Sequence, residues 1–170
     1  MKKVILFFVS LFFYFSLCAQ HNDLEFNQLK TALIFKIINS VTWQKSIPTD
    51  TFNIGIFGTD SLMFNSLKQM SKFKNIQGKP IKIKIFNRVS KIENIQLLYV
   101  TYTRNSALYR IFRKIQGKNI LLISDQSRSS NTMINLYLTR DDMSKRLLKF
   151  EVFRHNLEKE VFSVSYEILI

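Results

Sequence analysis

The stretches Leu97-Leu-Tyr-Val100 and Ile120-Leu-Leu-Ile123 decide the fold of this chain. Short, continuous apolar runs of this kind are typical of strands that are buried on both faces of a sheet. Between them, the residues from about Ser106 to Ile115 resemble a helix that stops at Gly117. A strand, a helix and a strand in this order predict a right-handed parallel crossover, because a twisted strand packs back on its sheet only that way. The core is therefore expected to be partly parallel.

A further strand and helix are predicted upstream of these runs. The segment Phe52-Asn-Ile-Gly-Ile-Phe57 alternates with a period of two, which is typical of a strand. Next come Thr59, Asp60 and Ser61, whose side-chain oxygens can accept backbone N–H groups, so we expect a helix from here to about Met70. Asp60 is therefore interpreted as a helix cap in preference to a ligand.

Two other patterns complete this half of the chain. Residues 24–43 carry apolar side chains at helical spacing and predict an amphipathic helix that ends near Trp43. Further on, Ile81, Ile83 and Ile85 alternate with lysines, which indicates a strand with one face in solvent. Because lysine discourages pairing with another chain, we expect this strand at an edge of the sheet.

The last third of the chain predicts an antiparallel ending. Residues 132–138 and 147–153 resemble strands joined by a polar turn, and residues 155–170 have apolar side chains at helical spacing. With only two prolines and four glycines, no segment resembles a linker. The predicted class is α/β: a single domain with a mixed, mostly parallel sheet of about six strands flanked by helices, ending in an antiparallel strand pair and a C-terminal helix.

The first residues have the composition of an export signal. Met1-Lys2-Lys3 is positively charged, and the segment from Val4 to Leu17 is apolar apart from two serines. A membrane-spanning helix needs roughly 20 apolar residues, and this run is shorter. We therefore predict a signal peptide over residues 1–19, with cleavage between Ala19 and Gln20, and an exported domain over residues 24–170.

The single cysteine, Cys18, decides whether the exported protein could carry a lipid anchor or a disulfide. Cleavage in front of Cys18 would make a lipoprotein, but that processing needs a small residue immediately before the cysteine, and Leu17 is bulky. If cleavage follows Ala19 instead, the mature chain has no thiol and no disulfide. About 150 residues are then enough to bury one core without cross-links.

The excess of basic residues indicates either an ordinary solvated surface or a surface that attracts an acidic partner or anionic lipid. The chain has 25 basic and 12 acidic residues, and removal of Lys2 and Lys3 leaves 23 basic residues. The basic residues are scattered, so a solvated surface is the ordinary explanation, and attraction to an acidic partner or to anionic lipid headgroups is the alternative. Export argues against nucleic acid as a partner.

Several local strings, in their order and spacing, resemble the YfiR-like family of periplasmic regulators. The likeness covers nearly the whole mature chain. The strings that carry it are Lys30-Thr-Ala-Leu-Ile-Phe-Lys-Ile-Ile-Asn-Ser-Val-Thr-Trp43, Phe52-Asn-Ile-Gly-Ile-Phe-Gly-Thr-Asp60, Asn119-Ile-Leu-Leu-Ile-Ser-Asp125 with Met133-Ile-Asn-Leu136, and Lys149-Phe-Glu-Val152 with Phe162-Ser-Val-Ser-Tyr-Glu-Ile-Leu169.

The resemblance implies a non-enzymatic exported domain that binds the periplasmic part of an inner-membrane signalling enzyme and sets its activity. That enzyme is a diguanylate cyclase in one pairing and a sensor histidine kinase in others. This chain departs from the family at Asn131-Thr132, where a glycine pair is usual, and at Phe153, where asparagine is common. Cysteines that cross-link family members are absent from the predicted mature chain, so control through thiols does not carry over.

Few residues suggest chemistry. The two histidines, His21 and His155, cannot form a histidine cluster for a metal, and we predict no metal, no cofactor and no catalytic site. The candidate contacts for a ligand or partner are Ser124, Asp125 and Arg128, which follow a predicted central strand where α/β folds place ligands. Each can equally belong to a solvated turn. Trp43 is a candidate partner anchor, although a place in the core is the preferred interpretation.

The functional prediction is a regulator that acts by protein-protein contact. The alternative is a periplasmic carrier or sensor of a small ligand, and an enzyme is the third class. The identity of the partner, the sign of the effect, the releasing signal and the formation of a homodimer stay open at this stage.

Overall fold

The computed structural model describes residues 24–43, 50–142, 145–160 and 162–164. The predicted signal peptide and its cleavage bond between Ala19 and Gln20 lie outside these residues. In the described part of the chain, no helix is long and apolar enough to cross a lipid bilayer.

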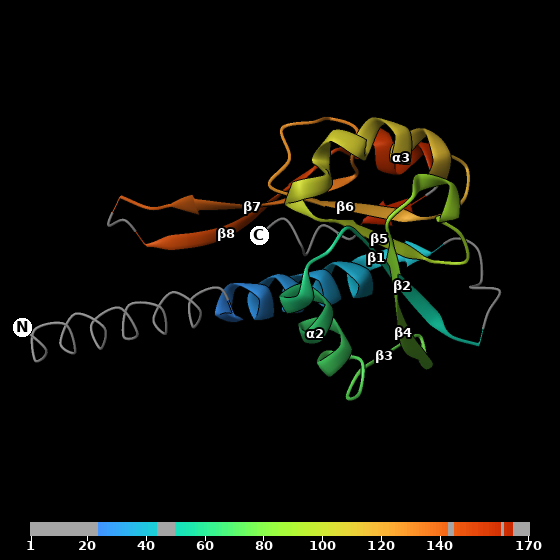
Figure 1. Cartoon of the computed structure of the whole chain (residues 1–170), viewed down its shortest axis with the longest axis horizontal. Helices are drawn as coiled ribbons and strands as arrows, with labels where there is room; N and C mark the ends of the chain where they lie inside the picture. Colours follow the sequence, from blue (N-terminus) through green and yellow to red (C-terminus); the bar gives the residue numbers. More distant parts are fainter. Residues whose placement is uncertain (1–23, 44–49, 143–144, 161, 165–170) are drawn as a thin grey trace, which may run out of the picture.

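The core of the molecule is one mixed sheet (Figure 1). Its order is β3-β4-β2-β5-β6-β7-β8, in which β4, β2, β5, β6 and β7 run parallel and the outermost strand at each edge is antiparallel. The predicted class is confirmed, with seven strands where about six were expected. The strands are β2 (Phe52–Phe57), β3 (Asn75–Ile76), β4 (Lys79–Phe86), β5 (Leu97–Val100), β6 (Leu121–Asp125), β7 (Ile134–Arg140) and β8 (Arg146–Val152).

The continuous apolar runs form the centre of this sheet, as predicted. Every residue of β2, β5 and β6 is buried. In the register, Tyr99 lies between Ile56 of β2 and Ile123 of β6, so its ring is enclosed by aliphatic neighbours. Burying an aliphatic side chain stabilises a fold by about 1.5–3 kcal/mol, and these strands supply much of the core.

The lysine-rich strand lies near the edge, as predicted. One side of β4 pairs with β2 along six residues, whereas the other side meets only the two residues of β3. Most of its outer edge is therefore unpaired, and Lys82 lies exposed on it. A charged, exposed edge of this kind resists pairing with a second chain.

Helices cover both faces of the sheet (Figure 1). The N-terminal helix (residues 24–40) and α2 (Ser61–Met70) lie on one face, and α3 (Leu108–Ile115) and α4 (Arg154–Lys159) lie on the other. Two short 3₁₀ helices, η1 (Val89–Lys91) and η2 (Tyr102–Ala107), lie in the connections before β5 and before α3. The crossover from β5 through α3 to β6 joins parallel strands, as expected.

Two helix boundaries differ from the prediction. The N-terminal helix ends at residue 40, and Val41–Trp43 form β1, which pairs antiparallel with β9 (Phe162–Val164). The predicted C-terminal helix is present as α4 but ends at Lys159, because β9 follows it. The helical spacing of apolar residues was misleading here, since Val41 and Phe162 bury their side chains by pairing across the chain.

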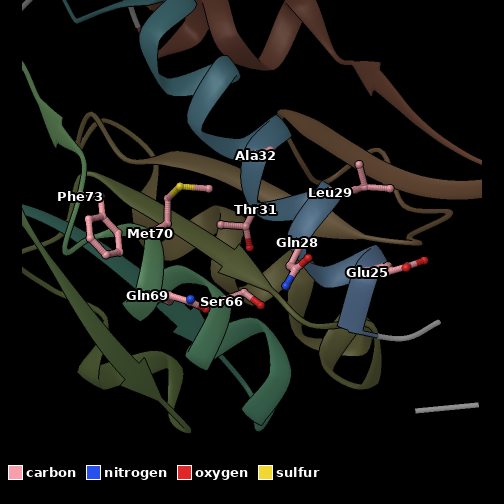
Figure 2. A pocket seen from close by; sticks show the side chains of 9 residues that line it. All are labelled: Glu25, Gln28, Leu29, Thr31, Ala32, Ser66, Gln69, Met70 and Phe73. Atoms are coloured by element: carbon pink, nitrogen blue, oxygen red, sulfur yellow. The ribbon is translucent and has the colours of Figure 1, made fainter. Parts of the chain in front are cut away.

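The N-terminal helix and α2 pack side by side and leave an apolar groove of about 610 Å³ between them (Figure 2). Leu29, Ala32, Met70 and Phe73 contribute apolar surface, and Gln28 and Gln69 add amides. Leu29 is 54% exposed and Phe73 is 79% exposed. We call this hollow the helix groove.

Candidate functional site

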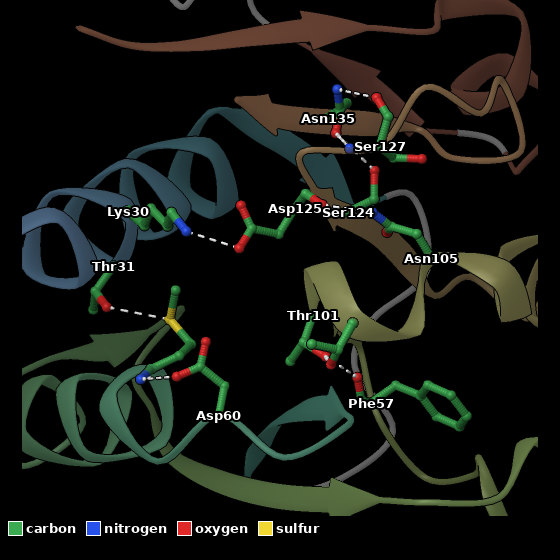
Figure 3. A network of polar contacts seen from close by, with 12 residues as sticks. Lys30, Thr31, Phe57, Asp60, Thr101, Asn105, Ser124, Asp125, Ser127 and Asn135 are labelled. Atoms are coloured by element: carbon green, nitrogen blue, oxygen red, sulfur yellow. Dashed lines mark hydrogen bonds and ion pairs between the residues drawn. The ribbon is translucent and has the colours of Figure 1, made fainter. Parts of the chain in front are cut away.

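The carboxyl ends of β2, β5 and β6 lie at the point where the order of the strands in the sheet reverses. From β2 the chain continues to β4 on one side, whereas β5 and β6 lie on the other side. Open α/β sheets place ligands at such a switch point. Figure 3 shows polar side chains gathered here, among them Lys30, Asp60 and Asp125. Tyr99 lies close to both aspartates, and we call Lys30, Tyr99, Asp60 and Asp125 the switch-point cluster.

A buried ion pair is the strongest contact of the switch-point cluster. Lys30 Nζ lies 2.7 Å from Asp125 Oδ2, and the two side chains are only 8% and 5% exposed. Lys30 comes from the N-terminal helix and Asp125 from the end of β6, 95 residues later. The pair therefore fastens the helix to the sheet, and losing either partner would leave a charge buried without compensation.

Lys30 was not among the residues predicted for the site. It precedes Ile34 by four positions and Ile37 by seven, so it lies on the helix face that packs against the sheet. A lysine on a buried helix face requires a counter-ion. That signal was present in the sequence, but the prediction of an amphipathic helix over residues 24–43 used the apolar residues alone.

Tyr99 places a phenol beside this pair. Its hydroxyl and Asp125 Oδ1 are both buried and have no hydrogen-bond partner within strict geometric limits among the described residues. Burial is the main cause that raises the pKa of Tyr99 well above its ordinary value of 10.0, and the nearby Asp125 carboxylate adds to the effect. Asp60 contributes less. The site therefore keeps a neutral phenol beside the buried Asp125 oxygen that Lys30 does not bind.

The turn after β2 brings Asp60 to the cluster. Gly58 has a φ of 116°, a conformation that L side chains rarely adopt, and an added Cβ would collide with the side chain of Thr101. Thr101 Oγ1 lies 3.2 Å from the Phe57 carbonyl oxygen and donates to it. Asp60 Oδ1 accepts the Met63 N–H at 2.9 Å and caps α2, which confirms its interpretation as a helix cap.

The loop after β6 is held by an amide (Figure 3). Asn135 Oδ1 accepts the Ser127 N–H at 2.9 Å and lies 3.1 Å from Ser124 Oγ, while Asn135 Nδ2 donates to the Ser127 carbonyl oxygen. Asn105 Nδ2 donates to the Asp125 carbonyl oxygen at 2.9 Å. These bonds fix the backbone around Asp125 and therefore the direction of its carboxylate.

The structure separates the three candidates that the sequence grouped together. Ser124 and Asp125 are buried and face internal partners, whereas Arg128 is exposed. Arg128 lines a pocket of about 630 Å³ together with Tyr102, Ser127, Tyr137 and Glu151. The pocket is polar and lies beside the ends of β6 and β7. Ser124 and Asp125 do not line this hollow, so Arg128 is the candidate that a ligand could reach.

Trp43 has the contacts of a core residue. Its ring meets Phe52 and Phe162 edge to face, with centroid distances of 5.3 and 5.1 Å. The indole N–H donates to the Ile38 carbonyl oxygen at 3.3 Å. Aromatic pairs of this geometry stabilise packing by about 0.5–1.5 kcal/mol beyond the area that they bury. Trp43 thus joins β1, β2 and β9.

The described part of the chain contains no cluster of side chains suited to binding a metal ion. There, no three side chains of His, Cys, Asp or Glu lie close enough to hold an ion together. The cation of the switch-point cluster is the Lys30 ammonium group itself.

Comparison with known proteins gives two findings. Residues 27–169 match the model of a family described as YfiR/HmsC-like. No curated protein matches the chain.

Proposed function

Since the chain belongs to the YfiR/HmsC-like family, we propose that it is a periplasmic regulator that binds the periplasmic part of an inner-membrane signalling enzyme and modulates its activity. The family match, which spans residues 27–169, is the observation that carries this proposal. The enzyme is a diguanylate cyclase, with cyclic di-GMP as its product, or a sensor histidine kinase. The regulator itself performs no catalytic step in this proposal.

A regulator of this kind must distinguish two states of its partner. If it bound both states with the same affinity, it would shift nothing, however tightly it bound. The contact surface must therefore match a shape that only one state presents. Rigid, preformed surfaces suit this task, because they lose little conformational entropy on binding.

The helix groove is the surface that best supports such a contact. Soluble proteins rarely expose large apolar side chains together, and such patches commonly mark protein interfaces. In the groove, Leu29 and Phe73 are exposed beside Met70, with amides at the rim. We propose that an apolar segment of the signalling enzyme's periplasmic part occupies it. The two walls are helices that pack on the sheet, so the groove is preformed.

Co-purification tests this function and its surface. The full chain, expressed with an affinity tag in its native host, is cross-linked in cells and recovered from detergent-extracted membranes. Wild type is expected to retain a membrane-bound cyclase or kinase. Phe73→Ser is expected to weaken that recovery about 30-fold, since truncating an interface aromatic costs about 2 kcal/mol or more. Leu147→Ser is the matched control, because it removes an exposed apolar side chain of β8 that does not line the helix groove.

The outcomes separate the function from the surface. If no signalling enzyme accompanies wild type, the regulatory function is wrong. If the enzyme accompanies wild type and Phe73→Ser equally, the function stands and the helix groove is not the contact.

A second candidate function is the binding of a small polar ligand at the Arg128 pocket. The volume of about 630 Å³ and the presence of a guanidinium, a carboxylate and two phenols favour this alternative. Native mass spectrometry of the protein recovered from cells would then reveal a bound metabolite, which Arg128→Ala would lose.

A further inference from the structure

The stretch between Glu93 and Asp125 contains no acidic residue. It includes η2, α3 and the buried strands β5 and β6. Because no carboxylate of this stretch offsets its basic residues, the local electrostatic potential is positive. The five basic residues in it are Arg104, Arg110, Arg113, Lys114 and Lys118.

The fold turns this charge outward on α3. Leu108, Ile111 and Ile115 are buried against the sheet. Arg110 and Arg113 are three positions apart on the opposite side, and both are exposed. In Figure 1, α3 is the outer layer on its face of the sheet. The basic side chains therefore project from the surface of the molecule.

The carboxylates around α3 do not form ion pairs with Arg110 or Arg113 among the described residues. The Glu160 carboxylate is buried and accepts the Gly117 N–H at 2.6 and 2.8 Å. Glu93 follows η1, which packs against α3, and Glu158 lies on α4 beside Lys159. Among the described residues, neither Arg110 nor Arg113 forms an ion pair.

A tyrosine accompanies the charge. Tyr109, which precedes Arg110 on α3, is 59% exposed. Tyrosine is enriched at the interface between membrane and water, where its ring can enter the headgroup region while its hydroxyl stays hydrated. We call the outer surface of α3 formed by Tyr109, Arg110 and Arg113 the cationic face.

We propose that the cationic face binds the surface of a bilayer that contains anionic phospholipid. The arginines pair with lipid phosphates, and Tyr109 lies among the headgroups. Charge complementarity selects this occupant, and the export assumed in the proposed function excludes nucleic acid as the natural one. The contact goes beyond that function, because it concerns lipid and lies on the face of the sheet opposite to the helix groove. The groove would then remain free for the signalling enzyme.

Vesicle flotation with the full chain tests the proposal. Vesicles of phosphatidylcholine alone are compared with vesicles that also contain phosphatidylglycerol. Wild type is expected to prefer the anionic vesicles and to lose that preference as salt shortens the Debye length from about 10 Å at 0.1 M to about 3 Å at 1 M. Arg110→Gln/Arg113→Gln is expected to reduce the preference roughly 25-fold, at about fivefold per charge.

A matched variant separates a defined face from net charge alone. Lys72→Gln/Lys74→Gln removes two exposed charges after α2, away from α3, and is expected to change the preference less than about twofold, because charges beyond a Debye length act weakly. Comparing each variant with wild type on the same vesicles cancels the contribution of the N-terminal segment, because all of them share it and its basic residues Lys2 and Lys3.

Three results would overturn the proposal. They are no preference for anionic vesicles, equal losses in the two double variants, and tighter binding to a single-stranded oligonucleotide than to anionic vesicles at the same salt. None of them depends on the recovery of a signalling enzyme, so this test can fail while the regulatory function stands.

Discussion

The ends of β2 and β6 carry the same chemical group and use it differently. After β2, Asp60 accepts the N–H of Met63, three residues away, and is half-buried. At the end of β6, Asp125 binds the ammonium group of Lys30, 95 residues away, and is almost fully buried. One carboxylate is therefore a local cap, and the other is a fastener between distant parts of the chain.

This difference implies a difference in energetic weight. An N-cap side chain typically contributes about 1 kcal/mol. Breaking a buried ion pair by removing one partner costs about 3–5 kcal/mol, because the remaining charge stays desolvated. The other Asp125 oxygen is also buried, and the carboxylate interacts with the Tyr99 hydroxyl. The three predictions below test this contrast from its strongest consequence to its weakest.

The largest expected effect comes from Lys30→Met. This variant leaves the Asp125 carboxylate buried without its counter-ion, and the free energy of unfolding should fall by about 3–5 kcal/mol. Urea unfolding followed by the fluorescence of Trp43, the single tryptophan, measures the change. The ring of Trp43 lies between Phe52 and Phe162, so its emission reports on the packing of β1 against β2 and β9.

A double variant is the control for this prediction. Lys30→Met/Asp125→Leu removes both charges and replaces them with apolar volume, so it should recover most of the loss. If the double variant were as unstable as Lys30→Met, the loss would come from packing of the N-terminal helix, and the ion pair would not be the fastener.

The second prediction concerns alkaline pH and Tyr99. Burial, and after it the Asp125 carboxylate, raises the pKa of Tyr99 well above 10.0. In the unfolded chain the phenol loses its proton near pH 10, while the folded state retains it, so the stability falls as the pH rises above that point. The slope is about 1.4 kcal/mol per pH unit until the pKa of the folded state is reached.

Tyr99→Phe should remove this alkaline loss. The substitution removes the interaction of the hydroxyl with Asp125, so stability at neutral pH should fall by about 1 kcal/mol at most. Unfolding midpoints measured from about pH 9 to about pH 11 test this expectation. Tyr109→Phe, which removes an exposed hydroxyl from α3, should keep the wild-type alkaline slope. Identical slopes in wild type and Tyr99→Phe would contradict the raised pKa.

Local patterns predicted most of the fold. The apolar runs of β5 and β6, the alternation in β4 and the Asp60 cap each depend on residues close in sequence, and the structure confirms them. The errors occurred where distant segments compete with local preference. Val41–Trp43 continue an apolar helical stripe, but pairing with β9 buries them better as a strand. No local pattern contains that information.

The candidate site was less predictable for the same reason. Asp125 was identified from its place after a central strand, but its partner Lys30 depends on how the N-terminal helix rotates against the sheet. The spacing of apolar residues did not reveal that Lys30 is buried while Leu29 is largely exposed. Arg128 and Glu151 line the same pocket only because β7 and β8 fold back beside β6.

The smallest expected effect comes from Asp60→Ala, which removes only the local cap. The free energy of unfolding should fall by about 1 kcal/mol, because one orphan N–H of the first turn of α2 loses its acceptor. Asp60→Asn keeps an oxygen in that place and should retain most of the stability, as measured by the same urea unfolding. A loss from Asp60→Ala as large as that from Lys30→Met would break the contrast. Asp60 would then be acting on the distant groups around Tyr99, and the two strand ends would form one coupled polar unit instead of two independent ones.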